Sequence, residues 1–369
     1  MTSVHQFVPN FSAGDAIGHH TVQVKRLLRS AGFESEIFAE AMAPEVRQEA
    51  RPWGEYGRRR PPADLIIYQC STGSPMVAFL RDRREPLAVN YHNITPAVFF
   101  DRWEPVAAGS MRRARAELLQ LVPRTQLAIA VSEFNAAELA GMGFPDPVVV
   151  PLLLDLASFD AAPDARALER LRRGAAGGAR WLFVGRLAPN KCQHDVIAAF
   201  AAYRLLHDPA ARLTLVGGFT SDQYRWSLEA MAAELGITDA VELTGTVTAP
   251  QLVAHFHAAD VFVCLSEHEG FCVPVVEAMH LGIPVVAFGA AALPDTIGDA
   301  GVLLPDKAPA LVATAVHHLL ADPDLRDALR RAGRQRAETF ARARTAPRML
   351  EVVEGFLSRS QPAAAPVPR

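Results

Sequence analysis

The chain has 369 residues, half of them hydrophobic and 21% charged, and its 37 Lys and Arg residues against 40 Asp and Glu residues leave a formal charge of −3. This length indicates two or three domains, and the balance of apolar and charged residues excludes a disordered chain. The near-neutral charge also excludes a protein dedicated to nucleic-acid binding, so we expect a globular protein with a large core.

Short apolar runs rich in β-branched residues recur in the first half of the chain. They lie at residues 64–68, 87–91, 127–131 and 148–150, and helix-length segments alternate with them at residues 21–31, 104–121 and 135–142. Each run has the length and composition of a buried strand. The alternation predicts a parallel sheet with helices on both faces.

The same pattern begins again in the second half, with apolar runs at residues 181–184, 213–216, 241–243, 261–265 and 283–288. Low-bulk residues near 155–178 predict a hinge between the halves. We therefore expect an α/β protein of two doubly wound parallel-sheet domains, residues 1–160 and 161–340, that face each other across a cleft. A long helix over residues 323–357, with a kink or break at Gly333 and Pro347, and a disordered tail over 358–369 complete the prediction.

Four cysteines, Cys70, Cys192, Cys264 and Cys272, are scattered without any Cys-x-x-Cys motif. Their spacing predicts neither a disulfide framework nor a structural zinc site, so we expect small buried side chains in a reducing compartment. Residues 1–10 lack the pattern of a secretory signal, and the apolar stretch at 281–293 is too short to span a membrane. These features predict a cytoplasmic protein without a membrane-spanning helix.

The most informative loop follows the apolar run at residues 261–265. Glu269 precedes Pro274, a residue that suits the first turn of a helix, and Glu277 lies on that same helix. Free backbone amides at the positive helix end bind phosphate or polarised hydroxyls. Here they belong to Gly270, Phe271, Cys272, Val275 and Val276. Two carboxylates at this spacing can hold different parts of one sugar-containing ligand, although a capping acid and a solvated helix residue explain them equally well.

A second loop, after residues 181–184, carries Gly185, Arg186 and Lys191 and leads into another helix. The two cations can clamp a diphosphate, with Gly185 permitting close approach and the helix dipole adding to the attraction. A solvated basic turn is the alternative.

Two further loops in the first half are weaker candidates. Gly14 and Gly18 leave the backbone open to a phosphate or a sugar, but their spacing matches no nucleotide-binding motif, so a plain turn is the alternative. His92 ends a predicted strand at the expected cleft edge, and a structural histidine is the alternative there.

The combination of Gly185-Arg186-x4-Lys191, Glu269-x7-Glu277 and the following Gly-Ile-Pro-Val-Val resembles family 4 of the retaining glycosyltransferases, which have the GT-B fold. The resemblance covers most of the chain. It implies two Rossmann-like domains, the first reading the acceptor and the second binding a nucleotide sugar, with a helix at residues 341–357 that returns to the first domain.

The resemblance also implies a role for each charged candidate. Glu269 and the amides after it hold the donor sugar, and Glu277 takes the ribose hydroxyls. Arg186 and Lys191 hold the diphosphate, and His92 lies near the reacting sugar and the acceptor. These four positions, Arg186, Lys191, Glu269 and His92, are the catalytic residues that the resemblance implies.

By the same resemblance, the loop of Gly14 and Gly18 closes on the donor phosphates, and the base lodges near Gly217 and the turn ending at Val247. Cys272 departs from the family, which more often has a small residue such as Gly there, and this leaves the shape of the donor-sugar site open. Residues 150–154 also depart from the family pattern, which leaves the hinge geometry open.

No third carboxylate is available as the nucleophile that double displacement requires, so front-face transfer is the expected mechanism. The departing phosphate takes the acceptor proton, and two fixed cations replace a divalent metal. We expect no cofactor, and the i, i+2 pair His255 and His257, with His268, does not predict a metal site. Alternatives are an epimerase or phosphorylase of the same fold, or a non-catalytic sugar-nucleotide-binding subunit; a nicotinamide oxidoreductase lacks its Gly-rich motif here.

The expected partners are a nucleotide-diphosphate sugar and a hydroxyl acceptor, which is a glycan, a lipid-linked glycan or a small molecule. Basic clusters at residues 58–60 and 112–115 leave open a peripheral contact with the inner face of a membrane, and solvated surfaces explain them equally well.

Overall fold

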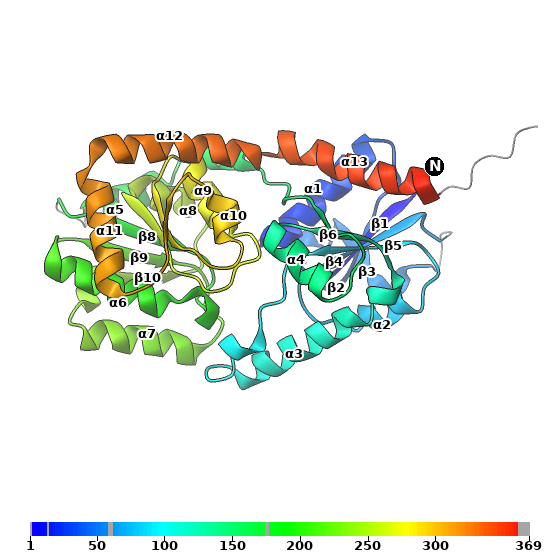
Figure 1. The fold of residues 1–369 in the computed structure, drawn as a ribbon, viewed down its shortest axis with the longest axis horizontal. Coiled ribbons are helices and arrows are strands. Elements are labelled where there is room, and N and C mark those ends of the chain that lie inside the picture. The colour runs from blue at the N-terminus through cyan, green and yellow to red at the C-terminus, as the bar shows by residue number, and fades with distance from the viewer. Residues whose placement is uncertain (1, 13–14, 58–61, 174–176, 361–369) are drawn as a thin grey trace, which may run out of the picture. The chain divides into compact units, whose positions relative to one another are not determined.

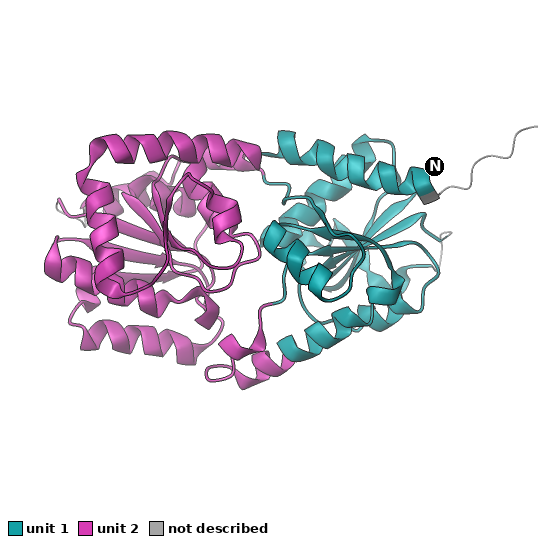
Figure 2. Ribbon diagram, in the orientation of Figure 1, with its two compact units in different colours: residues 1–94, 111–154, 341–369 teal, residues 95–110, 155–340 magenta. Residues whose placement is uncertain are grey.

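The computed structural model of the protein describes residues 2–12, 15–57, 62–173 and 177–360. It divides into two compact units, coloured separately in Figure 2. Unit 1 comprises Met1–Ile94, Met111–Leu154 and Ala341–Arg369, and unit 2 comprises Thr95–Ser110 and Asp155–Phe340.

Unit 1 is built on a parallel sheet whose strand order is β3-β2-β1-β4-β5-β6-β7 (Figure 1). Its strands are β1 Val4–Phe11, β2 Ile37–Met42, β3 Ala50–Pro52, β4 Leu65–Cys70, β5 Leu87–Tyr91, β6 Thr125–Ala130 and β7 Val148–Val149. Every residue of β4 and β5 is buried, because helices cover both faces of the sheet. The four apolar runs predicted as strands in this half are confirmed as β4, β5, β6 and β7.

The helices of unit 1 include α1 Ala16–Ser30, α2 Met76–Arg81, α4 Glu133–Gly141 and the C-terminal α13 Arg342–Ser360. Met349 and Val353 of α13 share an apolar core with Val24 and Leu28 of α1 and Ile67 of β4. Burial of these side chains ties the end of the chain to the first sheet.

Unit 2 has a second parallel sheet, of strand order β10-β9-β8-β11-β12-β13. Its strands are β8 Arg180–Val184, β9 Arg212–Val216, β10 Val241–Gly245, β11 Val261–Cys264, β12 Val285–Phe288 and β13 Val302–Leu304. The five runs predicted in the second half are confirmed as β8 to β12. The helices of the second half are α5 Ala165–Arg173, α6 Gln193–Leu206, α7 Asp222–Glu234, α8 Ala249–Ala258, α9 Val273–His280, α10 Leu293–Ile297, α11 Pro309–Ala321 and α12 Pro323–Thr339.

The division between the units falls after Leu154, six residues before the expected boundary, and residues 95–110 group with unit 2. Side-chain contacts explain the grouping of this segment. The rings of Trp103 and Tyr224 lie 5.2 Å apart, and Thr220 donates a hydrogen bond of 2.6 Å to Glu104. The helix α3, Pro105–Leu119, therefore begins in unit 2 and ends in unit 1.

The helical stretch expected at residues 323–357 is two helices, α12 and α13, and neither is broken at Gly333 or Pro347, where a kink or break was expected. Gly333 lies inside α12, where a Cβ would make ordinary van der Waals contact with Met279 at 3.4 Å, so the helix continues through this glycine. Pro347 lies near the start of α13, where it forfeits a single hydrogen bond. The tail expected from Ser358 still belongs to α13 as far as Ser360, and residues 361–369 lie outside the described part.

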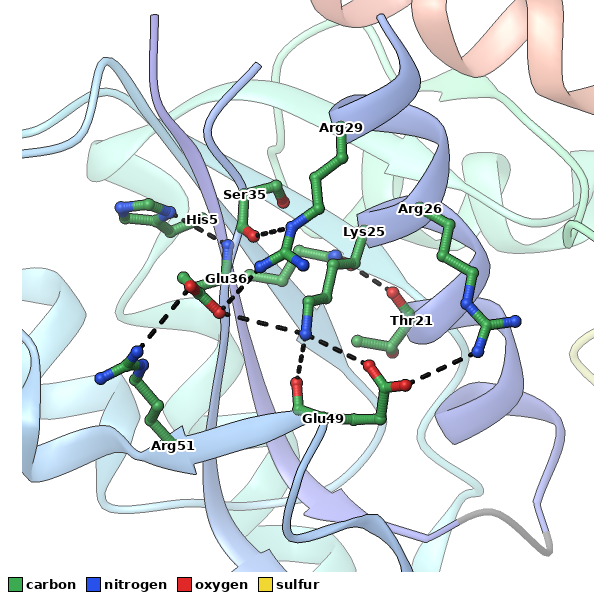
Figure 3. A network of polar contacts seen from close by, with 10 residues as sticks. His5, Thr21, Lys25, Arg26, Arg29, Ser35, Glu36, Glu49 and Arg51 are labelled. Atoms are coloured by element: carbon green, nitrogen blue, oxygen red, sulfur yellow. Dashed lines mark hydrogen bonds and ion pairs between the residues drawn. The ribbon is translucent and has the colours of Figure 1, made fainter. Parts of the chain in front are cut away.

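A network of ion pairs joins α1 to β2 and β3 in unit 1 (Figure 3). Lys25, which is 5% exposed, lies 3.2 Å from the Glu49 carboxylate and 4.0 Å from that of Glu36. Arg29 and Arg51 also contact Glu36. The carboxylates surround the buried ammonium, so these charges are satisfied within the fold.

None of the helices in the described residues is both long enough and apolar enough to cross a lipid bilayer.

Candidate functional site

Glycines at the carboxyl ends of β8 and β9 allow the backbones of the two following loops to approach each other closely. A Cβ on Gly217 would lie 2.0 Å from the carbonyl oxygen of Gly185, so no larger residue fits there. The Gly185 amide donates to Val216, and the Gly217 amide donates to Gly245 of β10, at 2.9 and 3.1 Å. The loops after three neighbouring strands thus come together at one edge of the sheet, where ligands of open α/β sheets bind.

The loop after β8 forms one turn of 3-10 helix, Pro189–Lys191, and then enters α6 through Cys192. Cys192 has a φ of 52°, in the left-handed region, and no side chain accepts a hydrogen bond from the first amides of α6. These amides therefore lack a side-chain cap, which leaves the positive end of the helix available to an anion.

The loop after β11 has the same construction. Cys272 has a φ of 72° and precedes α9, whose first turn contains Pro274 as predicted and again lacks a side-chain cap. A residue other than Gly in this left-handed conformation costs about 1 to 2 kcal/mol.

Polar contacts join these two loops. The side-chain Nδ2 of Asn190 donates to the His268 carbonyl at 3.0 Å, and the backbone amide of Glu267 donates to the Asn190 carbonyl at 3.0 Å. Lys191 forms an ion pair with the buried carboxylate of Glu269. Burial favours the neutral amine, but the Glu269 carboxylate outweighs it and raises the pKa of Lys191 above its ordinary value. The structure thus brings together two residues predicted from separate motifs.

Glu277 lies half-buried on α9, and its carboxylate has no hydrogen bond or ion pair within the described residues. Burial raises its pKa to about 8. A carboxyl group left without a partner in this way is free to bind hydroxyls of a ligand.

The remaining predicted residues of unit 2 differ in how far their side chains are exposed to solvent. Arg186 is exposed, and its carbonyl oxygen accepts a hydrogen bond of 3.1 Å from Gln193. Phe271 and Val276 are buried, so their side chains serve the core and leave only backbone groups for a ligand. Gly270 and Val247 are half-buried.

In the part of the chain that the structure describes, two groups of side chains bring possible metal ligands within 4.8 Å of one another: Cys192, His194 and Asp195, and Cys264, Glu269 and Cys272. An ammonium contacts a carboxylate in each group, Lys307 at Asp195 and Lys191 at Glu269. A positively charged side chain therefore lies beside each group of possible metal ligands. That the site works without a metal ion stays a prediction.

The predicted residues of unit 1 lie in that unit's own networks. His92 Nε2 is 2.7 Å from Gln69 Oε1, which also accepts a hydrogen bond from Asn90, while Gln69 itself donates to Gln6. His92 Nδ1 is buried without a hydrogen-bond partner, and burial lowers the pKa of His92 to about 3. The His92 ring is therefore neutral, and its Nδ1 atom is left able to accept a hydrogen bond.

Gly18 lies in the first turn of α1, and its amide donates to the Asp15 carboxylate at 2.6 Å. A Cβ on Gly18 would lie 1.8 Å from the carbonyl oxygen of Ser12, so the close approach of the backbone there requires a glycine at this position. Gly14 lies outside the described residues.

Asn190, Lys307 and the pairing of Cys264 with Cys272 were not identified from the sequence. Asn190 directly precedes Lys191, so its place in the motif is the signal that could have found it. Lys307 lies more than 100 residues from Asp195 in the chain, and nothing in its local sequence marks the contact.

Residues 175–336 match the family model described as Glycosyl transferases group 1. A D-inositol 3-phosphate glycosyltransferase of Kineococcus radiotolerans is 32% identical over 63% of this chain and 58% of its own length. One from Geodermatophilus obscurus is 29% identical over 90% of this chain and 83% of its own length. The chain thus covers less than two thirds of the first relative.

Two solved structures resemble the whole chain. Sucrose-phosphate synthase from Thermosynechococcus elongatus has a TM-score of 0.78 at 21% identity and covers 98% of this chain and 100% of its own. HepE from Anabaena, in complex with UDP and glucose, has a TM-score of 0.73 at 19% identity and covers 96% of this chain and 100% of its own. The predicted class of two Rossmann-like parallel-sheet domains, as in GT-B proteins, is confirmed.

Proposed function

Residues 175–336 form a Glycosyl transferases group 1 domain, and from that premise we propose that the chain is a retaining glycosyltransferase using a nucleotide-diphosphate sugar and a hydroxyl acceptor. The observation that carries the proposal is the pairing of Lys191 with Glu269 beside two helix starts without side-chain caps. A diphosphate matches the ammonium and the free amides, and a sugar hydroxyl matches the carboxylate.

In this proposal, unit 2 binds the donor. Lys191 and the exposed Arg186 contact the diphosphate, and Glu269 fixes hydroxyls of the sugar. Glu277 accepts hydrogen bonds from the ribose, which supplies the partner that its carboxyl lacks in the unliganded protein. The base lies beside Gly217 and Val247, and the role of His92 near the reacting sugar stays a prediction.

The transfer step is a front-face displacement. The acceptor oxygen forms a bond to the anomeric carbon while the bond from that carbon to the phosphate oxygen breaks, and the departing phosphate takes the acceptor's proton. Negative charge grows on the leaving group, so Lys191 and Arg186 stabilise the transition state more than the ground state. These two cations make a divalent metal unnecessary in the proposed mechanism.

The test is a transfer assay with a panel of UDP-, GDP- and ADP-sugars. D-inositol 3-phosphate is the first acceptor to try, because both relatives are named for it. We expect a product that keeps the donor's anomeric configuration by NMR, and activity that survives EDTA. An inverted product, or activity that vanishes in EDTA and returns with Mg²⁺ or Mn²⁺, contradicts the mechanism.

A binding assay separates transfer from simple nucleotide-sugar binding. A donor at 100 times its dissociation constant raises the free energy of unfolding by about 2.7 kcal/mol, which a thermal-shift screen detects. Stabilisation by a donor without transfer to any acceptor points instead to a non-catalytic binding subunit.

For the acceptor, we propose a hydroxyl compound that is presented in solution or on a lipid. The exposed arginines Arg112 and Arg113 lie on α3 and suit contact with an anionic membrane surface. Sedimentation with vesicles of anionic and of neutral lipids decides between the two: binding to the anionic vesicles alone supports a lipid-linked acceptor.

A further inference from the structure

Two cysteines that are eight residues apart in the sequence meet at the loop after β11. Cys264 ends β11 and Cys272 precedes α9, and their sulfur atoms lie 4.0 Å apart. Cys264 is 1% exposed and Cys272 is 7% exposed. A disulfide requires a sulfur separation of about 2.05 Å, so closing this pair requires an approach of about 2 Å.

The backbone of Cys272 gives the thiol further significance. With a φ of 72°, this residue occupies a conformation that Gly adopts without strain and that costs another residue about 1 to 2 kcal/mol. Cys192 has the same left-handed conformation, so what distinguishes Cys272 is the residue beside its side chain. Here the side chain is a thiol aimed at a second thiol.

We propose that Cys264 and Cys272 form a reversible disulfide that lowers donor binding, an inference that rests on the proposed function for its effect on activity. The oxidant is a low-molecular-weight disulfide. One cysteine thiolate attacks a sulfur of the oxidant, forming a mixed disulfide and releasing one thiol. The second thiolate then attacks the protein sulfur of the mixed disulfide, forming the Cys264–Cys272 bond and releasing the second small thiol.

The surroundings favour this pair over the other two cysteines. The hydrogen bond with Cys272 lowers the pKa of Cys264 below its ordinary value, and the same hydrogen bond together with burial raises the pKa of Cys272. Burial raises the pKa of Cys192 to about 12, and it raises the pKa of Cys70 further. Because thiolates are the reactive species, Cys264 is the attacking thiol of the pair, and Cys70 and Cys192 react less readily than Cys264.

The disulfide acts on the site through the loop that it closes. Residues 265–271 lie between the two cysteines and carry Glu269, and Cys272 directly precedes the first turn of α9. Drawing Cys272 toward β11 shifts both the carboxylate that pairs with Lys191 and the free amides of the helix start. These groups are the proposed donor contacts, and a displacement of about 1 Å is enough to weaken such contacts. We therefore expect the donor KM to rise at least about tenfold.

The experiment treats the full chain with oxidised glutathione or diamide and measures chemistry and activity separately. Cleavage at Glu267 and Glu269 separates the two cysteines, so mass spectrometry finds the fragments joined only when the disulfide is present. Nucleotide-sugar binding and initial transfer rates are measured on the same samples before and after dithiothreitol.

We expect the joined fragments, loss of two free thiols and a donor KM at least about tenfold higher, all reversed by dithiothreitol. Cys264→Ala should keep its basal activity and lose the response to oxidant, with Cys264→Val as a second variant if the first folds poorly. Cys70→Ala, the matched control, should respond like the wild type.

Unlinked fragments after oxidation, a disulfide that leaves donor affinity unchanged, or a Cys264→Ala variant that stays equally sensitive overturns the proposal. If no transfer is found with any donor, the proposed function fails, and the fragment analysis and nucleotide binding still decide the disulfide.

Discussion

The helices that follow the key loops begin differently in the two units. In unit 1, α1 begins after Asp15, whose carboxylate accepts a hydrogen bond from the Gly18 amide. In unit 2, α6 and α9 begin after the left-handed residues Cys192 and Cys272, and no side chain caps either helix. An acidic cap satisfies a helix start from within the protein, whereas a bare start leaves its amides and its positive dipole end for an anion.

This difference separates two candidates that look alike in sequence, because both are loops with glycines before a helix. The Asp15 carboxylate opposes a phosphate at α1, while Lys191 attracts one near α6 and α9. That the loop of Gly14 and Gly18 contacts the donor phosphates stays a prediction. The close approach of the Ser12 carbonyl explains the glycine at position 18 without any ligand.

The largest expected effect comes from Lys191→Ala. The variant removes the cation beside the two bare helix starts, so turnover should fall by about two or more orders of magnitude in initial-rate assays. Arg173→Ala is the control, because Arg173 forms an exposed ion pair with Glu169 on α5 and has no role in the proposed site. An equal fall in turnover in the two folded variants would contradict the proposed role of Lys191 in stabilising the leaving group.

Glu277→Ala should act mainly on donor binding. The ribose contacts exist in both ground and transition states, so the donor KM should rise about tenfold with a smaller change in turnover. Glu229→Ala, on the exposed face of α7, should leave both constants unchanged. An unchanged donor KM in a folded Glu277→Ala protein contradicts the proposed ribose contact.

Glu277 should also make stability depend on pH. Burial raises its pKa from 4.5 to about 8, so between these values the folded protein binds a proton that the unfolded chain does not. Stability conferred by this group is therefore present at low pH and falls as the pH rises toward 8. Glu277→Gln should flatten that part of the Tm profile, and identical profiles for variant and wild type would contradict the pKa.

The smallest expected effect is that of Asp15→Ala in unit 1. Losing the cap should lower the free energy of unfolding by about 1 kcal/mol, as should Ser221→Ala at the start of α7. Donor KM should stay unchanged in the Asp15 variant. If the KM changes, the loop before α1 contacts the donor, and the contrast between the two units weakens.

Much of the fold could be read from the sequence because the central strands are buried on both faces. Such strands appear as continuous apolar runs, which is why the strands from β4 to β12 were found within about two residues of their ends. β1, β2, β3 and β13 were not among the predicted runs; β2 and β3 each contain exposed residues, so they lack a continuous apolar run. No break occurs at Gly333, because a single glycine costs a helix only about 1 kcal/mol and α12 continues through it.

The sequence alone determined the two-sheet class and the candidates Lys191, Glu269 and Glu277, because Lys191 and Glu269 lie between a strand and the helix that follows it and Glu277 lies in the first turns of such a helix. Local spacing fixes which sheet edge a side chain reaches, and this information is present in the chain itself. The tertiary structure decided what those side chains contact: the Lys191–Glu269 pair, the meeting of Cys264 with Cys272, and the Asp15 cap that occupies the start of α1. These outcomes depend on left-handed turns and on loops from different strands packing together, and one-dimensional spacing contains neither.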